Sequence, residues 1–505
     1  MMSWSGRRIL LSLSLTLSLG VVIATTQTSA PRIWDDRSLA DWAMPIASLN
    51  LRPAHFSAAE YYAAREDNYR TYPVYHPDSE PTGYWDELNR RKPEPMVDVT
   101  TITSNAEWIA AGERAFRDMD AVLSRSSDPA LIAQARDPRA FEGVLKLNDG
   151  TAFGPRWVVT PQGVQIGFLA CGGCHFAIQP DRSVRFAGPG GPVPPGTPPL
   201  NPRGNNGALA TRRFLEARFP GDTIGVALWR QWSVPWDPDD RVERIRNIVG
   251  AELAPLIGQT PGTSPRVNGS PFFATRVPDL RLLRYYRYID ATGTHRLRGP
   301  EDVARYAALI TGADPMTFGA HRMLNDAQRK VSYRYADEVL YAIGTYLLSL
   351  EPPKNPSPPP ADLVARGEQV FRREQCGTCH PAPNYTTGEL TPALGYDVPA
   401  NHLASRDVRA RTVGTDRGLA LRTRKGTGFY KIPSLRGLWY RPLLLHDGSI
   451  VSLEELFDPA RLDPEYERKG WSPPGVTKGA VPGLEFLTKL SPDDRTAMIA
   501  FLRSL

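Results

Sequence analysis

Two stretches of five residues, CGGCH at residues 171–175 and CGTCH at residues 376–380, combine residue types that can hold a metal-containing group. Together they contain all four cysteines of the chain. Two cysteines separated by two residues and followed directly by a histidine are the attachment signature of c-type haem. The thiols bond to the haem and the histidine binds its iron. The predicted haem-binding residues are Cys171, Cys174 and His175 for the first haem, and Cys376, Cys379 and His380 for the second.

Other uses of paired cysteines fit this spacing less well. A zinc ribbon separates its cysteine pairs by roughly 15–20 residues, whereas these two pairs lie about 200 residues apart. A redox-active or disulfide-forming pair does not need a histidine next to it. Thiol or disulfide chemistry is the alternative that the residues leave open.

The surroundings of the two motifs repeat as well. AGERAFR (residues 111–117) matches RGEQVFR (residues 366–372), and VPDLR (residues 277–281) matches IPSLR (residues 432–436). Each copy then ends in an apolar stretch with helical periodicity. Four features in the same order indicate two copies of one domain.

Helices are expected at the end of each copy. The first is predicted within residues 325–350, where apolar residues recur every three or four positions. The second is predicted after Ser491, a typical N-cap, with Pro492 in its first turn. In the cytochrome c fold, which this pattern resembles, a glycine of the first helix lets the last helix cross closely. The resemblance implies contacts of Gly112 and Phe116 with Tyr346 and Leu347, and of Gly367 and Phe371 with Phe501 and Leu502.

The predicted fold class is mainly α, with two tandem cytochrome c-like domains that each hold one covalent haem. Long loops and a small β insertion in the first domain are also expected. The stretch RWVVTPQGVQIGFLA predicts a hairpin, and AGPGGPVPPGTPPLNPRGNNG predicts an irregular loop. The predicted divisions are a signal peptide at residues 1–24, with cleavage as late as residue 30, an extended N-terminal segment at residues 31–103, a first haem domain at residues 104–350, a proline-rich linker at residues 351–360, and a second haem domain at residues 361–505.

The N-terminus has the features of a secretory signal peptide. Arg7 and Arg8 precede an apolar run, and Val22 and Ala24 form a small-residue cleavage pattern. An uncleaved membrane anchor is the alternative, although the run is short for a membrane span. The sequence therefore predicts a periplasmic or secreted protein.

The composition and the net charge limit the kinds of molecule that the protein is expected to bind. The chain of 505 residues is 41% apolar, which is enough for a buried core, and its 48 prolines predict many loops. The net charge of +6 is spread along the chain without a block of lysine and arginine. No nucleic-acid partner is expected.

The sixth ligand of the second iron decides how that haem behaves, because a second strong ligand closes the iron to small molecules. His402 and His446 follow the second motif, and Met498 lies in the last predicted helix, where a core role is expected. His446 is favoured because an apolar run leads to it and an Asp-Gly turn follows it. A histidine that only hydrogen-bonds the turn is the alternative.

The first iron lacks the same ligand. When the P-x-L-R segments are aligned together with Asp290 and Asp447, Ile289 occupies the position of His446. Isoleucine cannot bind iron, so the first haem is expected to be open to small ligands. The remaining candidates for its sixth ligand are His295, His321, Met316 and Met323.

The segment YKIPSLRGLWYRPLLLHDGSIVSLEELF resembles the second-domain signature of bacterial di-haem cytochrome c peroxidases and their relatives, including the tryptophan-tryptophylquinone-maturing enzyme and the di-haem rubber oxygenases. The resemblance covers roughly residues 104–505 and is specific at the two haem motifs and at this segment. It implies a reactive N-terminal haem and an electron-transferring C-terminal haem. Some relatives also hold a calcium ion between the domains, so calcium is a further cofactor that the resemblance suggests.

The chain departs from the peroxidases in its ligands. Ala460 stands where peroxidases have a ligand methionine, and no histidine follows the first motif closely. The rubber oxygenases use two histidines at this haem, which matches His446. The tryptophan that bridges the haems in this group is missing, and Tyr288 is the candidate in its place. Trp229, Trp232 and Trp236 lie nearby in the sequence, and each is expected to serve packing.

The expected function is therefore a periplasmic di-haem c-type cytochrome oxidoreductase of the peroxidase or oxygenase type. The first haem would react with hydrogen peroxide or dioxygen, and the second would exchange electrons with a small redox protein. The alternative is a non-catalytic di-haem electron-transfer cytochrome in which both irons have six ligands.

Overall fold

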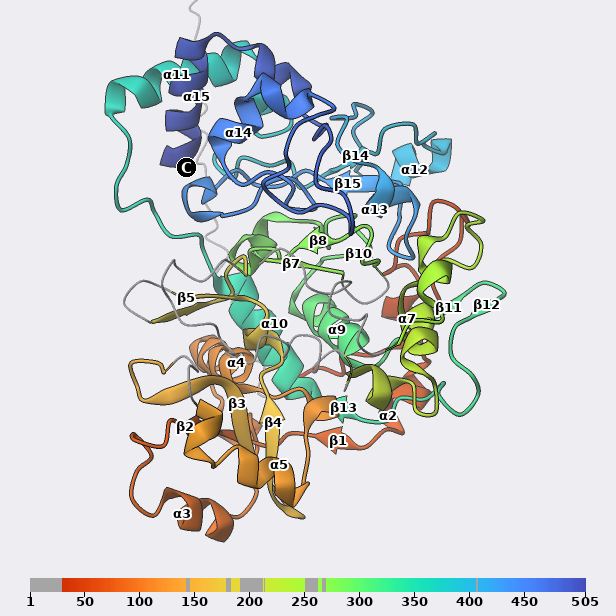
Figure 1. Ribbon diagram of the computed structural model, residues 1–505, viewed down its shortest axis with the longest axis vertical. Coiled ribbons are helices and arrows are strands. Elements are labelled where there is room, and N and C mark those ends of the chain that lie inside the picture. Colours follow the sequence, from red (N-terminus) through yellow and green to blue (C-terminus); the bar gives the residue numbers. More distant parts are fainter. Residues whose placement is uncertain are drawn as a thin grey trace, which may run out of the picture.

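The computed structural model describes residues 30–141, 146–178, 183–190, 212, 214–249, 262–265, 269–405 and 407–505. The predicted signal peptide lies outside these residues, and so does most of the predicted loop that follows the first motif. More of the described residues lie in helices than in strands, as the mainly α prediction requires (Figure 1). Among the described helices, none is both long and apolar enough to cross a membrane.

Long helices and short 3-10 turns carry most of the regular structure. The longer helices are α4 (Asn105–Asp118), α7 (Ile224–Trp232), α9 (Pro300–Thr311), α10 (Asp337–Ser349), α11 (Ala361–Arg373) and α15 (Pro492–Ser504). The shorter helices are α1 (Asp36–Leu39), α2 (Ala58–Tyr62), α3 (Tyr84–Arg90), α5 (Pro129–Gln134), α12 (Ala400–Ser405), α13 (Gly418–Leu421) and α14 (Leu453–Phe457).

Each of the two repeated parts contains one close crossing of two helices. Gly367 lets α11 approach α15 so closely that a Cβ at this position would lie 2.0 Å from the Ala497 carbonyl oxygen. A Cβ on Gly112 of α4 would lie 1.9 Å from the Ala342 carbonyl oxygen of α10. The predicted glycine crossings are thus confirmed, and Phe371 packs on Phe501 beside one of them, with ring centroids 5.1 Å apart.

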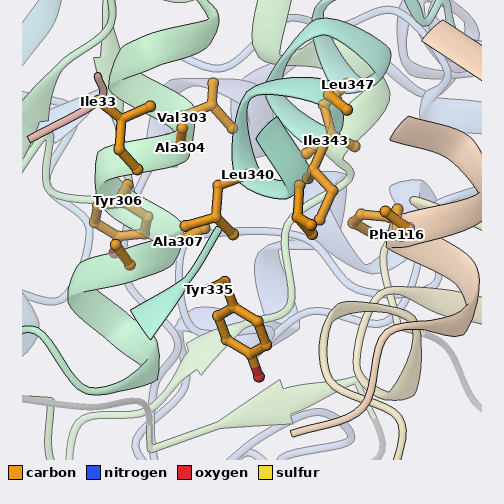
Figure 2. Close-up of a cluster of buried hydrophobic side chains, with 14 of the residues drawn as sticks. Ile33, Phe116, Val303, Ala304, Tyr306, Ala307, Tyr335, Leu340, Ile343 and Leu347 are labelled. Carbon is orange, nitrogen blue, oxygen red and sulfur yellow. The ribbon is translucent and has the colours of Figure 1, made fainter. Parts of the chain in front are cut away.

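The crossing of α4 with α10 is the centre of the largest hydrophobic core. Figure 2 shows Leu340, Ile343 and Leu347 of α10 pointing between Phe116 of α4 and the apolar face of α9. Phe116 also meets Tyr346 with ring centroids 5.9 Å apart, which is the aromatic contact expected at this crossing. In Figure 1, α10 runs through the middle of the molecule, and α11 with α15 lies at one end of it.

The predicted hairpin is present and joins a three-stranded antiparallel sheet. β3 (Thr151–Thr160) and β4 (Gly163–Phe168) pair with each other, and β2 (Thr71–Tyr75) from the N-terminal segment pairs with β3. The remaining strands are short pairs: β1 (Glu66–Asp67) with β13 (Arg334–Tyr335), β5 (Phe176–Ile178) with β6 (Val184–Phe186), β7 (Thr263–Ser264) with β8 (Thr275–Arg276), β9 (Tyr288–Ile289) with β10 (His295–Arg296), β11 (Thr317–Phe318) with β12 (His321–Arg322), and β14 (Leu390–Pro392) with β15 (Phe429–Lys431).

The N-terminal segment at residues 31–103 contains α1, α2, α3, β1 and β2. Ile33, Trp34, Trp42 and Tyr61 from this segment are buried in the core around α10. Trp34 stacks on Tyr61 with ring centroids 4.7 Å apart. The segment therefore completes the core of the first copy.

The closing helix of the first copy, α10, lies within residues 325–350, as predicted. It begins at Asp337, because the preceding residues of β13 form a parallel pair with β1. The second closing helix begins as predicted, since Ser491 accepts a hydrogen bond from the Asp494 backbone and Pro492 occupies the first turn.

Candidate haem sites

Both cysteine motifs form the same short turn against the first helix of their copy. The turn η4 (Cys171–Gly173) contacts α4, and the turn η8 (Cys376–Thr378) contacts α11. The His175 backbone N–H donates to the Cys171 carbonyl at 3.1 Å, and that of His380 donates to Cys376 at 2.9 Å. This helical turn keeps both thiols and the histidine of each motif within one turn of backbone.

A main-chain carbonyl lies within hydrogen-bond distance of each of the two histidine rings. Nδ1 of His175 lies 3.2 Å from the Pro278 carbonyl oxygen. Nδ1 of His380 lies 3.0 Å from the Tyr385 carbonyl oxygen, and the Pro433 carbonyl also hydrogen-bonds to this ring. Iron-binding histidines usually donate one ring N–H to such a carbonyl, which directs the other nitrogen toward the metal. Pro278 and Pro433 occupy equivalent repeat positions, and Pro433 also interacts with the ring of His380.

The titration of these groups favours ligation over thiol chemistry. Burial lowers the pKa of His380 to about 4, which keeps the ring in the neutral form that binds iron. Burial raises the pKa of Cys171 to about 12 and that of Cys376 to about 11. Reactive redox cysteines have lowered pKa values instead. No disulfide joins the four cysteines, all of which are described.

A cavity of about 450 Å³ lies beside the second motif. The aromatic rings of Phe371, Tyr385 and Phe501 form its apolar wall, and His380 also faces it. The other lining residues are Glu368, Arg372, Gln375, Gly377, Thr378 and Ala382. A cavity with an aromatic wall and a polar rim next to the predicted iron ligand suits a flat, largely hydrophobic group that carries polar substituents.

Each motif therefore has the two thiols and the histidine that a covalently bound haem needs, and beside the second motif there is also a cavity for it. Among the described residues, no three His, Cys, Asp or Glu side chains gather in a way that could hold a metal ion by themselves. The four cysteines accordingly do not form a common zinc site. The same observation gives the suggested calcium site no support.

His446 lies half-buried against Tyr430, with ring centroids 4.4 Å apart. Its Nδ1 lies 3.2 Å from the Thr415 hydroxyl, and its Nε2 lies 3.2 Å from the Tyr430 hydroxyl. Tyr430 donates its own proton to the Asp416 carbonyl at 2.6 Å, so Nε2 is the donor toward Tyr430. Ligation by His446 would require the ring to give up one of these hydrogen bonds.

The other candidates for the second iron are buried. His402 of α12 is 2% exposed and lies near the Phe429 ring. Met498 belongs to the core between α11 and α15, which confirms its predicted packing role.

The four candidates for the sixth ligand of the first iron lie in different parts of the structure. Ile289 of β9 is directly paired with His295 of β10, so both side chains lie on the same face of this strand pair. His295 is buried, and its ring lies 4.2 Å from that of Trp42. Met316 and Met323 are core residues of a separate cluster around α7, and His321 packs on Trp236. Only His295 among these four is adjacent to the position that corresponds to His446.

Tyr288 is 1% exposed and packs between residues of both copies. Its neighbours are Met44 from the N-terminal segment and Leu390 and Phe429 from the second copy. Tyr288 therefore lies where the two copies meet. Trp232 is buried in the α7 cluster, and Trp229 and Trp236 pack against it, as predicted.

The arginine of each P-x-L-R segment contacts a tyrosine that follows the other P-x-L-R segment. The Arg281 guanidinium lies 5.5 Å from the centre of the Tyr440 ring, and that of Arg436 lies 5.2 Å from the Tyr285 ring. Each tyrosine follows the arginine of its own segment by four positions. The sequence showed the repeat but gave no signal for this reciprocal contact.

Other buried charged residues were also not found from the sequence. Lys425 donates to Asp290 at 3.1 Å and to the Tyr306 hydroxyl at 2.9 Å. Arg424 is 2% exposed and donates to backbone carbonyls at the end of α7. Both residues connect the second copy to the first.

Comparison with known proteins gives no family. No family model matches the chain, and no curated protein matches it. Solved structures match at 14–20% identity and TM-scores of 0.20–0.28. They include hydrazine synthase from Kuenenia stuttgartiensis (14% identity, 56% of this chain and 86% of that chain, TM-score 0.28), a MauG-like protein associated with microbial copper homeostasis (18%, 46% and 73%, 0.27) and the diheme peroxidase BthA from Burkholderia thailandensis (19%, 50% and 76%, 0.25). Similarity at this level does not assign the chain to a family.

Proposed function

We propose that the chain is an exported di-haem c-type cytochrome with oxidoreductase activity. The observation that carries this proposal is the repeated geometry of the two motifs. In each copy a Cys-x-x-Cys-His turn contacts a glycine-containing helix, and a main-chain carbonyl lies within hydrogen-bond distance of the histidine ring, that of Pro278 at 3.2 Å from His175 and that of Tyr385 at 3.0 Å from His380. A thiol site would not need this second contact.

The two sites would have different roles. Haem iron with an open position can react with peroxide or dioxygen, whereas a six-ligand iron transfers electrons. Ile289 at the position of His446 favours the open role for the first site. His175 and His380 would each hold iron from one side, and Tyr288 lies between the two copies. A small redox protein would supply electrons through the second site.

A second function is a non-catalytic electron carrier. It is supported by the register of β9 and β10, which places His295 next to Ile289 on the same face. In this alternative His295 would close the first iron. The two functions therefore differ in the spin state and ligand access of the first haem.

Counting haems and testing their ligands decides between these functions. The purified protein should contain two covalent haems in a pyridine haemochrome assay, one low-spin and one that binds cyanide. The double variant Cys171→Ala/Cys174→Ala should lose the cyanide-binding haem, and Cys376→Ala/Cys379→Ala should lose the low-spin haem. Fewer than two haems in the unmodified protein would refute the proposal. Two low-spin haems that bind no cyanide in either redox state would favour the electron carrier.

Replacing His446 with alanine tests the ligand of the second iron. Loss of a strong sixth ligand should convert only the C-terminal haem from low-spin to high-spin, as read from its optical and electron paramagnetic resonance spectra. Tyr430→Phe is the matched control, because it removes the hydroxyl that now bonds to His446 and leaves the imidazole in place. An unchanged spectrum in His446→Ala would show that His446 only hydrogen-bonds its neighbours.

A further inference from the structure

Three arginines gather where the P-x-L-R segments of the two copies meet, and we call Arg276, Arg281 and Arg441 the arginine cluster. Arg281 is 5% exposed and Arg441 is 7% exposed. Tyr286 and Asp279 lie among them, since Tyr286 interacts electrostatically with Arg441, Arg276 and Asp279. The cluster therefore combines side chains from both copies.

The cluster is short of negative charge. Asp279 forms a long ion pair with Arg281, with 3.9 Å to its Nε, and Asp279 and Asp447 both act electrostatically on Arg276. The oxygens of Asp279 already accept hydrogen bonds from the Arg281 backbone and the Tyr440 hydroxyl. Among the described residues, no carboxylate lies within ion-pair distance of Arg276 or Arg441. Burial lowers the pKa of Arg276 to about 10, and repulsion from Arg441 adds to this effect.

Two of the guanidinium groups also have N–H donors that nothing described accepts. Nη1 of Arg281 and Nε of Arg441 are buried without a hydrogen-bond partner in the described part of the chain. The bonds that the cluster does make go to neutral carbonyls. Arg281 donates to Phe186 at 3.2 Å, Arg441 to Ser434 at 2.9 Å, and Arg276 to Leu445 at 2.8 Å. Buried charges that are only partly neutralised cost several kcal/mol, so three guanidinium groups around one ion-paired carboxylate would be stabilised by a further anion.

The cluster lies beside the first candidate haem site. Pro278, whose carbonyl bonds to His175, stands between Arg276 and Arg281 in the chain. Arg281 interacts electrostatically with Tyr346, which packs on Phe116 near His175. The carboxylates of haem are its two propionates, and an arginine binds a carboxylate through paired N–H donors.

We infer that the arginine cluster binds haem propionates, with Arg281 holding a propionate of the haem attached at Cys171 and Cys174. This inference rests on the proposed haem function. The positive charge of Arg281 would stabilise the reduced iron and raise its reduction potential. It would also keep the propionate ionised to lower pH.

Arg281→Gln in the haem-loaded protein tests the inference. The propionate bending band in the resonance Raman spectrum should shift, the reduction potential of one haem should fall, and the pH at which this potential changes slope should rise. Arg281→Lys keeps the charge, so it should retain most of the potential while still shifting the Raman band. Arg436→Gln is the matched control, because Arg436 holds the same repeat position but is bonded to Tyr285 and Glu351.

The outcomes separate this inference from the proposed function. Two haems with Raman bands and potentials that Arg281→Gln leaves no more altered than Arg436→Gln would overturn the inference alone. A protein without covalent haem would overturn both. If Arg281→Gln does not accumulate, the Raman band of Arg281→Lys decides, and an unchanged band there would equally overturn the inference.

Discussion

Gly367→Ala is expected to destabilise the part of the chain that holds the second motif by about 3 kcal/mol. The added Cβ would lie 2.0 Å from the Ala497 carbonyl oxygen and 2.6 Å from the Cβ of Phe501. Backbone atoms of α15 would have to move away, and the contact of Phe371 with Phe501 would open. Alanine gains only about 1 kcal/mol over glycine in a helix, so the net effect remains a large loss.

Urea unfolding monitored at the absorption of the C-terminal haem measures this effect. Gln369→Ala is the control, because Gln369 is exposed on the same helix and its replacement should change stability by less than about 0.5 kcal/mol. Gly112→Ala should act in the same way on the N-terminal haem, since its Cβ would lie 1.9 Å from the Ala342 carbonyl oxygen. A Gly367→Ala protein as stable as the Gln369→Ala protein would contradict the close crossing.

Arg424→Met should separate the second copy from α7 and cost about 3 kcal/mol of stability or more. The Arg424 side chain donates to the carbonyls of Trp229 at 3.3 Å and Arg230 at 2.8 Å, and also to that of Ser233. These carbonyls lie at the C-terminal end of α7, where a positive charge interacts favourably with the helix dipole. Methionine has a similar length but removes every one of these donors, and of the three carbonyls that of Trp229 still accepts from the Ser233 N–H at 2.9 Å. Burial lowers the pKa of Arg424 to about 9, so the residue remains charged at neutral pH.

Arg422→Met provides the comparison for this variant. Arg422 is two positions away, is one-third exposed, and forms an ion pair with Asp237 at 3.0 Å. Its replacement should cost no more than about 1 kcal/mol. Differential scanning calorimetry and limited proteolysis near residue 233 should therefore distinguish the two variants. Equal melting temperatures would show that the contact of Arg424 with α7 does not stabilise the protein.

Local sequence patterns predicted the parts of the fold that depend on neighbouring residues. The N-cap at Ser491, the hairpin of β3 and β4, and the glycine crossings at Gly112 and Gly367 were all visible as short patterns. The residue at which α10 begins was not predicted, because β13 ends just before it and pairs with β1, a strand more than 260 residues earlier. Pairing over such a distance leaves no periodic signal in the sequence.

The residues that surround the candidate ligands could not be predicted from the sequence either. His446 was singled out from its own segment, but Thr415 and Tyr430, which bond to its ring, come from other segments. The repeat made Arg281 and Arg436 equivalent, yet burial leaves a donor of Arg281 without a described partner whereas Arg436 is bonded to Tyr285 and Glu351. Charge compensation depends on which side chains meet in space, which the repeat alone does not determine.

Arg281 contacts Tyr440, and Arg436 contacts Tyr285. Because these contacts orient the two copies, the linker at residues 351–360 only has to keep the copies close to each other. Each copy uses the same arginine and tyrosine positions to contact the other copy, which is the way two identical subunits meet across a two-fold axis. The chain can be regarded as an intramolecular dimer whose linker supplies a high effective concentration of one copy for the other. After a cut in the linker, the two fragments would still carry the surfaces that recognise each other.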